Sequence, residues 1–173
     1  MSDKSSVIGF GDLEKKMLSL SGSVTLEIKK VVARRAVEVE TDAKRSVQGG
    51  GKTGRVYVKS AIKRGRGKNR KVVGHNFHRA SAPGEAPATD TGRLVSNIST
   101  LVTLDGMEAE IGVFGKIVDD DGESRNYARD LEFGTTKMAA RPFLQPALEK
   151  NKEKIIRTVN DAIKKGLKNV TSS

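Results

Sequence analysis

The stretch Arg55–Phe77, RVYVKSAIKRGRGKNRKVVGHNF, places two β-type runs on either side of a basic, glycine-spaced centre. In RVYVKS, Val56 and Val58 alternate with residues of the opposite face, which is the period-2 pattern of a strand. KVVGHNF supplies the return strand, and the glycines between the runs permit a turn. The stretch predicts a two-stranded basic β-arm within an insertion over residues 49–80.

The centre of this arm carries six positive side chains and no acidic neighbour: Lys63, Arg64, Arg66, Lys68, Arg70 and Lys71. No Asp or Glu occurs between Ala43 and Gly84, although the net charge of the whole chain is +11. Three uses fit such a run: contact with a phosphate backbone, docking on an acidic protein surface, or a solvated tip. RGRG is similar to the arginine-glycine segments of RNA-binding proteins, but only Tyr57 and Phe77 flank it as stacking partners.

Upstream of the arm, residues 13–47 are predicted to be helical. A short helical piece from Leu13 to Leu20 precedes a longer helix, for which Ser23 is the predicted N-cap. The apolar residues of the longer helix follow amphipathic spacing: Val24, Ile28, Val31, Val32, Val39 and Ala43. The glycines of QGGGKTG, Gln48–Gly54, end this helix.

Downstream of the arm, residues 81–90 form a proline-containing strap that is predicted to be extended. A short helix is expected to begin at Asp90 or Thr91, with an inner face of Leu94, Val95 and Ile98. The runs STLVTL and MEAEIGVF then predict a hairpin, joined by Asp105-Gly106 in a type I′ turn.

The C-terminal part predicts two more helices. NYARDLEFGT pairs Tyr127 with Leu131 on one face and stops at Gly134. RPFLQPALEKNKEKIIRTVNDAIKKGLKNV predicts a long helix with Pro146 in its first turn and a buried stripe of Leu148, Ile155, Val159, Ile163 and Leu167. The expected fold class is α+β: an antiparallel β-sheet packed by long N- and C-terminal helices, with a protruding basic β-arm. One domain covers residues 1–173, and its sheet and helices occupy residues 91–173.

The sequence gives little support for a nucleotide site, a zinc site or a calcium site. SVQGGGKT has Ser46 where a phosphate-binding loop needs glycine, and the helix-then-strand context is reversed. His75 and His78 are too few for a structural zinc site in a chain without cysteine. Asp119–Glu123 lacks the ligand spacing of a calcium loop. We therefore expect no enzyme, no metal and no cofactor.

The composition bears on location and on assembly. The sequence shows no signal peptide and no membrane span, so synthesis in a cytoplasm is expected. Only 36% of residues are apolar and 4% aromatic. A core of this composition is thin, which suggests that partner subunits share in its stability.

The linked order of SAPGEAPATDTGRLVSNI, a hairpin, YARDLEFGT and ARPFLQPAL resembles the neck or tail-completion proteins of long-tailed bacteriophages. The resemblance covers residues 81–150, whereas the insertion at 49–80 departs from the common core of that family. It implies a non-catalytic virion protein, made in the host cytoplasm, that forms a ring at the head–tail junction through which DNA passes. The residues that match the motifs are Asp90, Thr91, Gly92, Arg93, Leu131, Glu132, Phe133, Gly134, Arg141, Pro142 and Phe143.

The resemblance also implies partners: other copies of the chain in a ring of six or, alternatively, twelve, and the adjoining head-completion and tail-terminator or tail-tube proteins. The motif residues serve either the fold of the monomer or the contacts between subunits. Two rival functions stay open, namely a tail-terminator ring and a sequence-independent nucleic-acid-binding module that uses residues 52–79. For the arm we favour docking on a neighbouring subunit or on an adjoining ring, because a cationic wall in a DNA channel would hold phosphates and slow their passage.

Overall fold

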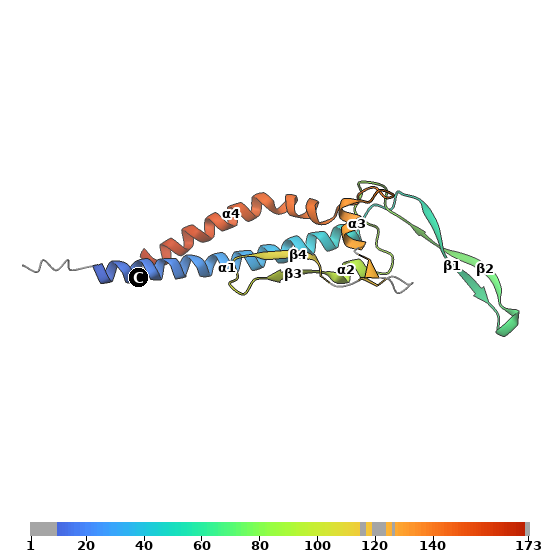
Figure 1. Ribbon diagram of the computed structural model, residues 1–173, viewed down its shortest axis with the longest axis horizontal. Helices are drawn as coiled ribbons and strands as arrows, with labels where there is room; N and C mark the ends of the chain where they lie inside the picture. Colours follow the sequence, from blue (N-terminus) through green and yellow to red (C-terminus); the bar gives the residue numbers. More distant parts are fainter. Residues whose placement is uncertain (1–9, 115–116, 119–123, 126, 172–173) are drawn as a thin grey trace, which may run out of the picture. The chain divides into compact units, whose positions relative to one another are not determined.

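The computed structural model describes residues 10–114, 117–118, 124–125 and 127–171. The N-terminal helix α1 spans Phe10–Gln48, and the arm consists of β1 (Val56–Arg64) and β2 (Lys71–Arg79) around a 3-10 turn at Gly67–Asn69 (Figure 1). The remaining elements follow in the order α2 (Arg93–Asn97), β3 (Ile98–Val102), β4 (Ala109–Val113), β5 (Ile117–Val118), β6 (Ser124–Arg125), α3 (Tyr127–Phe133) and α4 (Leu144–Thr171). The fold is α+β, as predicted. Its strands form three separate pairs, β1–β2, β3–β4 and β5–β6.

The chain divides into two compact units. Unit 1 comprises residues 1–37, 101–110 and 151–173, and unit 2 comprises residues 38–100 and 111–150. Helices α1 and α4 and the β3–β4 hairpin each contribute residues to both units.

In unit 1, α1 packs against α4 at close range. A Cβ atom on Gly166 would lie 2.6 Å from the Cα of Val24, so this glycine allows the two helix backbones to approach. Lys165 Nζ contacts Glu27 Oε2 at 2.9 Å beside the crossing. The Lys165 and Lys30 ammonium groups both lower the pKa of the Glu27 carboxyl. The predicted packing of the long helices is therefore present.

The buried face of α4 differs from the predicted stripe. The buried residues are small or polar, namely Ala147, Asn151, Ala162 and Gly166, whereas Leu148 and Leu167 are exposed. The other three residues of the predicted stripe, Ile155, Val159 and Ile163, are half-buried. The prediction ranked residues by their apolar size, but a close helix crossing leaves room only for small residues at its centre.

Helix α1 is also longer than predicted. It runs without a break from Phe10, so Leu13–Leu20 is not a separate piece and Ser23 is not an N-cap. Gly22 lies inside the helix, where glycine costs about 1 kcal/mol relative to alanine. Contacts of the next turn with α4 offset that cost. The predicted buried positions Val39 and Ala43 are confirmed.

The β3–β4 hairpin is present, but its turn is not type I′. That type needs positive φ at both central residues, and among the described residues only glycines have positive φ. Gly106 has φ of 70°, and its N–H donates to the Thr103 carbonyl at 2.8 Å. The Asp105 carboxylate instead accepts hydrogen bonds from the Thr103 hydroxyl and the Met107 N–H, which lower its pKa. The hydrogen bonds of the Asp105 side chain thus stabilise this turn.

Unit 2 holds most of the buried apolar side chains. They come from α1, α2, β3, α3 and the start of α4: Val39, Ala43, Val47, Leu94, Ile98, Ala128, Leu131, Phe143 and Ala147. Phe143, Ile98 and Val47 are the largest fully buried ones. The Thr100 hydroxyl donates to Glu40 Oε2 at 2.6 Å, which ties β3 to α1. The predicted inner positions Leu94 and Ile98 are confirmed, although Ile98 belongs to β3 rather than to the short helix.

Candidate functional site

The predicted arm is a two-stranded antiparallel ribbon. Its register runs from the pair Val56–Arg79 at the base to the pair Arg64–Lys71 at the tip. Backbone bonds between Gly54 and Ala80 (2.9 Å) and between Ala80 and Arg55 (3.0 Å) continue the ladder below it. Gly65, at φ of 118°, makes the turn possible, since a Cβ there would lie 2.4 Å from a backbone oxygen.

The six predicted cations gather at the tip of this ribbon. Lys63 and Arg64 end β1, Lys71 begins β2, and the other three lie in the turn. All six are exposed, and none of them forms an ion pair within the described part of the chain. The tip is thus a concentrated positive charge without an internal counter-ion.

The register gives the arm two unlike faces. Bulges at Lys59 and Val73 shift the alternation of side chains. One face holds the hydrogen bond from Asn76 to Ser60 and the pair of Tyr57 and His78. The opposite face, called here the arm face, holds Val56, Val58, Lys63, Val72, Val73, Phe77 and Arg79, all exposed.

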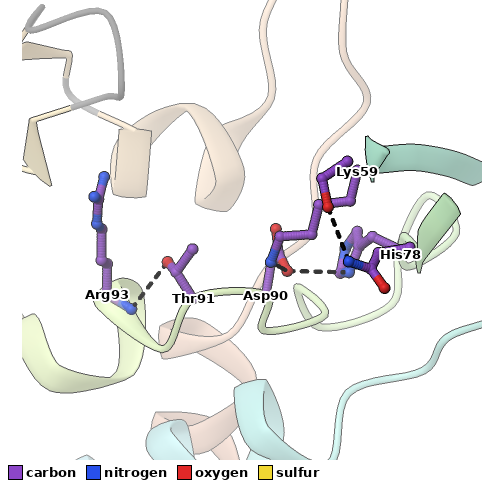
Figure 2. A network of polar contacts seen from close by, with 7 residues as sticks. Lys59, His78, Asp90, Thr91 and Arg93 are labelled. Atoms are coloured by element: carbon purple, nitrogen blue, oxygen red, sulfur yellow. Dashed lines mark hydrogen bonds and ion pairs between the residues drawn. The ribbon is translucent and has the colours of Figure 1, made fainter. Parts of the chain in front are cut away.

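The polar side of the arm is anchored at its base by Asp90. The Asp90 carboxylate accepts a hydrogen bond from Lys59 Nζ and lies 3.6 Å from His78 Nδ1 (Figure 2). Asp90 and His78 border a cavity of about 320 Å³, which is also lined by Pro87–Thr89 of the strap, Arg93 and Tyr127. Thr89 Oγ1 lies buried in its wall without a hydrogen-bond partner in the described structure.

Asp90 and Thr91 do not cap α2, contrary to the prediction. The N-cap position is Gly92, at φ of 76°, and no side-chain cap bond forms there. Thr91 Oγ1 lies 3.4 Å from the Arg93 N–H, at the long end of the hydrogen-bond range (Figure 2). Asp90 contacts the arm because the Lys59 ammonium on β1 offers a charge-assisted hydrogen bond, which is stronger than a bond from a single backbone amide.

Loosening of the arm base is expected when Asp90 loses its charge. Lys59, and to a smaller extent His78, lower the pKa of the Asp90 carboxyl below its usual 3.8. A carboxyl with a lowered folded-state pKa stabilises the fold above its unfolded-state pKa, and this stabilisation is lost as pH falls through the lowered value. The Asp90→Asn substitution should mimic that loss at neutral pH. Because the pair is partly exposed, amide exchange near Lys59 and His78 should rise about fivefold or less, with global stability nearly unchanged. Unchanged exchange at these amides would contradict the anchoring role.

The second motif, LEFG, contains the side chain that caps the N-terminal end of α4. Glu132, a buried residue of α3, accepts hydrogen bonds from the backbone N–H groups of Phe143 (2.8 Å), Leu144 (3.0 Å) and Gln145 (2.9 Å). The next residue, Pro146, has no N–H, so one carboxylate satisfies the amides available at this helix end. Its negative charge also suits the positive end of the helix dipole.

The residues between α3 and α4 complete the same framework. Gly134 has φ of 76°, and a Cβ there would lie 2.8 Å from the Ala140 nitrogen. Arg141 donates its backbone N–H to Leu131 (2.7 Å) and its Nε to the Ser81 carbonyl (3.3 Å), so it ties the loop to the strap. Pro142 is half-buried and Phe143 fully buried, whereas Phe133 is 75% exposed. Most of this motif holds unit 2 together, and Phe133 alone of LEFG projects into solvent.

The glycine run after α1 is a packed linker, in agreement with its helix-then-strand context. The backbone of Gly50 lies against the Ala86 and Pro87 carbonyls, and Thr53 donates to Glu85 at 2.6 Å. His75 contacts the Phe77 ring, whereas His78 belongs to the arm base. Asp119–Glu123 lies outside the described residues. Within the described ranges, no group of three His, Asp or Glu side chains could hold a metal ion, and no helix is long and apolar enough to span a bilayer.

The motifs at 90–93 and at 131–143 thus both belong to unit 2, as does the basic run of the arm. Sequence reasoning missed the contacts of Glu132 and Lys59, because both join residues far apart in the chain. Comparison of the chain with protein-family models, with curated proteins and with solved structures finds no match.

Proposed function

We propose that this chain is a structural virion protein of a long-tailed phage, which joins head to tail and keeps the DNA channel continuous. It acts without catalysis, as a ring of six or twelve copies in the neck or tail of the virion. Its neighbours would be the head-completion and the tail-terminator or tail-tube proteins. A position as the tail-terminator ring is a variant of the same proposal.

One observation carries the proposal: the arm presents an apolar face and six unpaired cations to solvent. Phe77 is 65% and Val58 61% exposed, although both are β-type apolar residues on one side of a ribbon. Two-stranded ribbons are marginally stable in water, so such a face gains stability when a partner covers it. Most of the residues that match the motifs hold unit 2 together, so the exposed arm is the surface left for contacts with partners.

Particles provide the direct test. In a phage that carries this gene, removal of the protein should leave filled heads and tails unattached, or tails with a defective end, as seen by electron microscopy. The expected loss of infectivity is nearly complete, because an open junction cannot pass DNA to the tail. Intact, infectious particles without the protein would overturn the proposal.

The exposed cations also favour a second candidate, a sequence-independent nucleic-acid-binding module. Contacts of six cations with phosphates would give a slope of roughly −5 for log affinity against log salt on duplex DNA. Neutralising the tip cations should then abolish binding to DNA duplexes of unrelated sequence, and to the same extent for each of them. Absence of any retardation at low salt would remove this candidate.

A further inference from the structure

Two apolar surfaces of the molecule are exposed, and they carry opposite charge. The first is the arm face, whose cations are Lys63 and Arg79. The second is the outer side of the β3–β4 hairpin, called here the hairpin face, which holds Leu101, Glu108 and Glu110 and ends at Leu104 in the turn, all exposed. Each surface belongs to a two-stranded sheet, to which no other strand of the described residues pairs.

The hairpin face follows from the contacts of β3. Thr100 points toward α1, where it bonds Glu40, so the neighbouring Leu101 points away from that helix. On β4, Ala109 and Ile111 are half-buried, and Glu108 and Glu110 alternate with them on the outer side. Leu104 at the turn is fully exposed.

Neither acidic residue of the hairpin face is neutralised internally. Glu108 and Glu110 form no ion pair within the described part of the chain. Leu101 is 52% exposed beside them, so apolar area and negative charge occur together. This is the complement of the arm face, where apolar area and positive charge occur together.

The charge of the arm decides which occupant fits it. Two arm faces cannot pair with each other, because no acidic residue occurs between Ala43 and Gly84 and cation would meet cation. Nucleic acid would neutralise the cations but would leave Val58 and Phe77 in water. A protein surface that is both apolar and acidic satisfies both demands.

We propose that the arm face of one copy docks on the hairpin face of a second copy. The inference rests on the proposed assembly function and names the contact that would produce it. Donor and acceptor are different surfaces, so the contact is head-to-tail and leaves each copy with one free donor and one free acceptor. Repetition of such a contact gives a closed ring where the rotation between successive copies closes, as the proposed function requires, and an open filament where it does not.

Charge reversal in two variants tests this pairing. One variant carries Lys63→Glu and Arg79→Glu on the arm face, and the other carries Glu108→Lys and Glu110→Lys on the hairpin face. Each variant alone brings like charges together and should self-associate at least about tenfold more weakly than wild type in sedimentation velocity. An equimolar mixture should recover association, because each reversed arm then meets a reversed hairpin on another copy. The matched control Lys52→Glu with Lys137→Glu changes two exposed cations outside both faces and should associate as wild type does.

The outcomes separate this inference from the function on which it rests. Single variants that associate like wild type, or a mixture that stays dissociated, overturn the pairing of these faces while assembly itself stands. A wild-type chain that never associates overturns the assembly function as well. If duplex DNA binding is lost in the arm variant and association is unchanged, nucleic acid is the partner of the arm and the inference is wrong.

Discussion

The Glu132→Ala substitution should lower the free energy of unfolding by about 3 to 5 kcal/mol. The carboxylate accepts three backbone N–H bonds at the start of α4 and is only 7% exposed. Its removal strands these donors beside the buried Phe143 and removes a charge that favours the helix N-terminus. Urea unfolding followed by circular dichroism measures the loss.

Two further variants sharpen this prediction. Glu132→Gln retains the shape and one acceptor oxygen, so its loss should be clearly smaller than that of alanine. Glu153→Ala, which removes a carboxylate of α4 from an exposed pair with Arg157, should change stability by about 0.5 kcal/mol or less. If Glu132→Ala came within about 1 kcal/mol of wild type, α4 would not depend on this carboxylate.

Local periodicity explains which parts of the fold could be predicted from sequence. The arm has two β-type runs around glycines, and the helices α1 and α4 have long amphipathic patterns. Each of these elements could therefore be predicted from one continuous stretch of sequence. The hairpin position was predicted for the same reason. The type of its turn was not predicted. The Asp105 carboxylate accepts hydrogen bonds from the Thr103 hydroxyl and the Met107 N–H, and these bonds favour a turn other than the type I′ turn that Asp-Gly usually forms.

The parts that were missed depend on contacts between distant residues. The buried face of α4 is set by the approach of Gly166 to Val24, whereas sequence analysis weighs apolar size. From the sequence alone Glu132 is an ordinary polar residue of LEFG, because its three backbone N–H partners lie 11 to 13 residues further along the chain. An acidic residue shortly before a glycine turn and a Pro-containing helix start is a signal that could have suggested it.

The sequence predicted the positive charge of the arm, but it did not predict which side chains share the arm face. The six cations are evident in the sequence, yet the arm face depends on the register and on the bulges at Lys59 and Val73. Each bulge adds a residue and shifts the alternation, so a simple period-2 reading assigns Lys63 and Val72 to the wrong face. The role of Asp90 likewise required the position of both strands.

Removal of the arm should abolish self-association without unfolding the rest of the chain. Replacement of residues 56–79 by Asn-Gly keeps the backbone bonds of Gly54 and Arg55 with Ala80 and closes the ladder with a tight turn. The deleted residues contribute none of the buried apolar side chains. Stability should therefore change by about 1 kcal/mol or less, while the apparent dissociation constant for assembly should rise by about a hundredfold or more.

Sedimentation velocity of the full chain beside the arm-less chain tests most directly the claim that the arm serves adhesion between subunits. We expect the full chain to form a closed oligomer as concentration rises and the arm-less chain, with an unchanged melting temperature, to stay monomeric. A full chain that is monomeric throughout, or an arm-less chain that reaches the same oligomer, would contradict the claim.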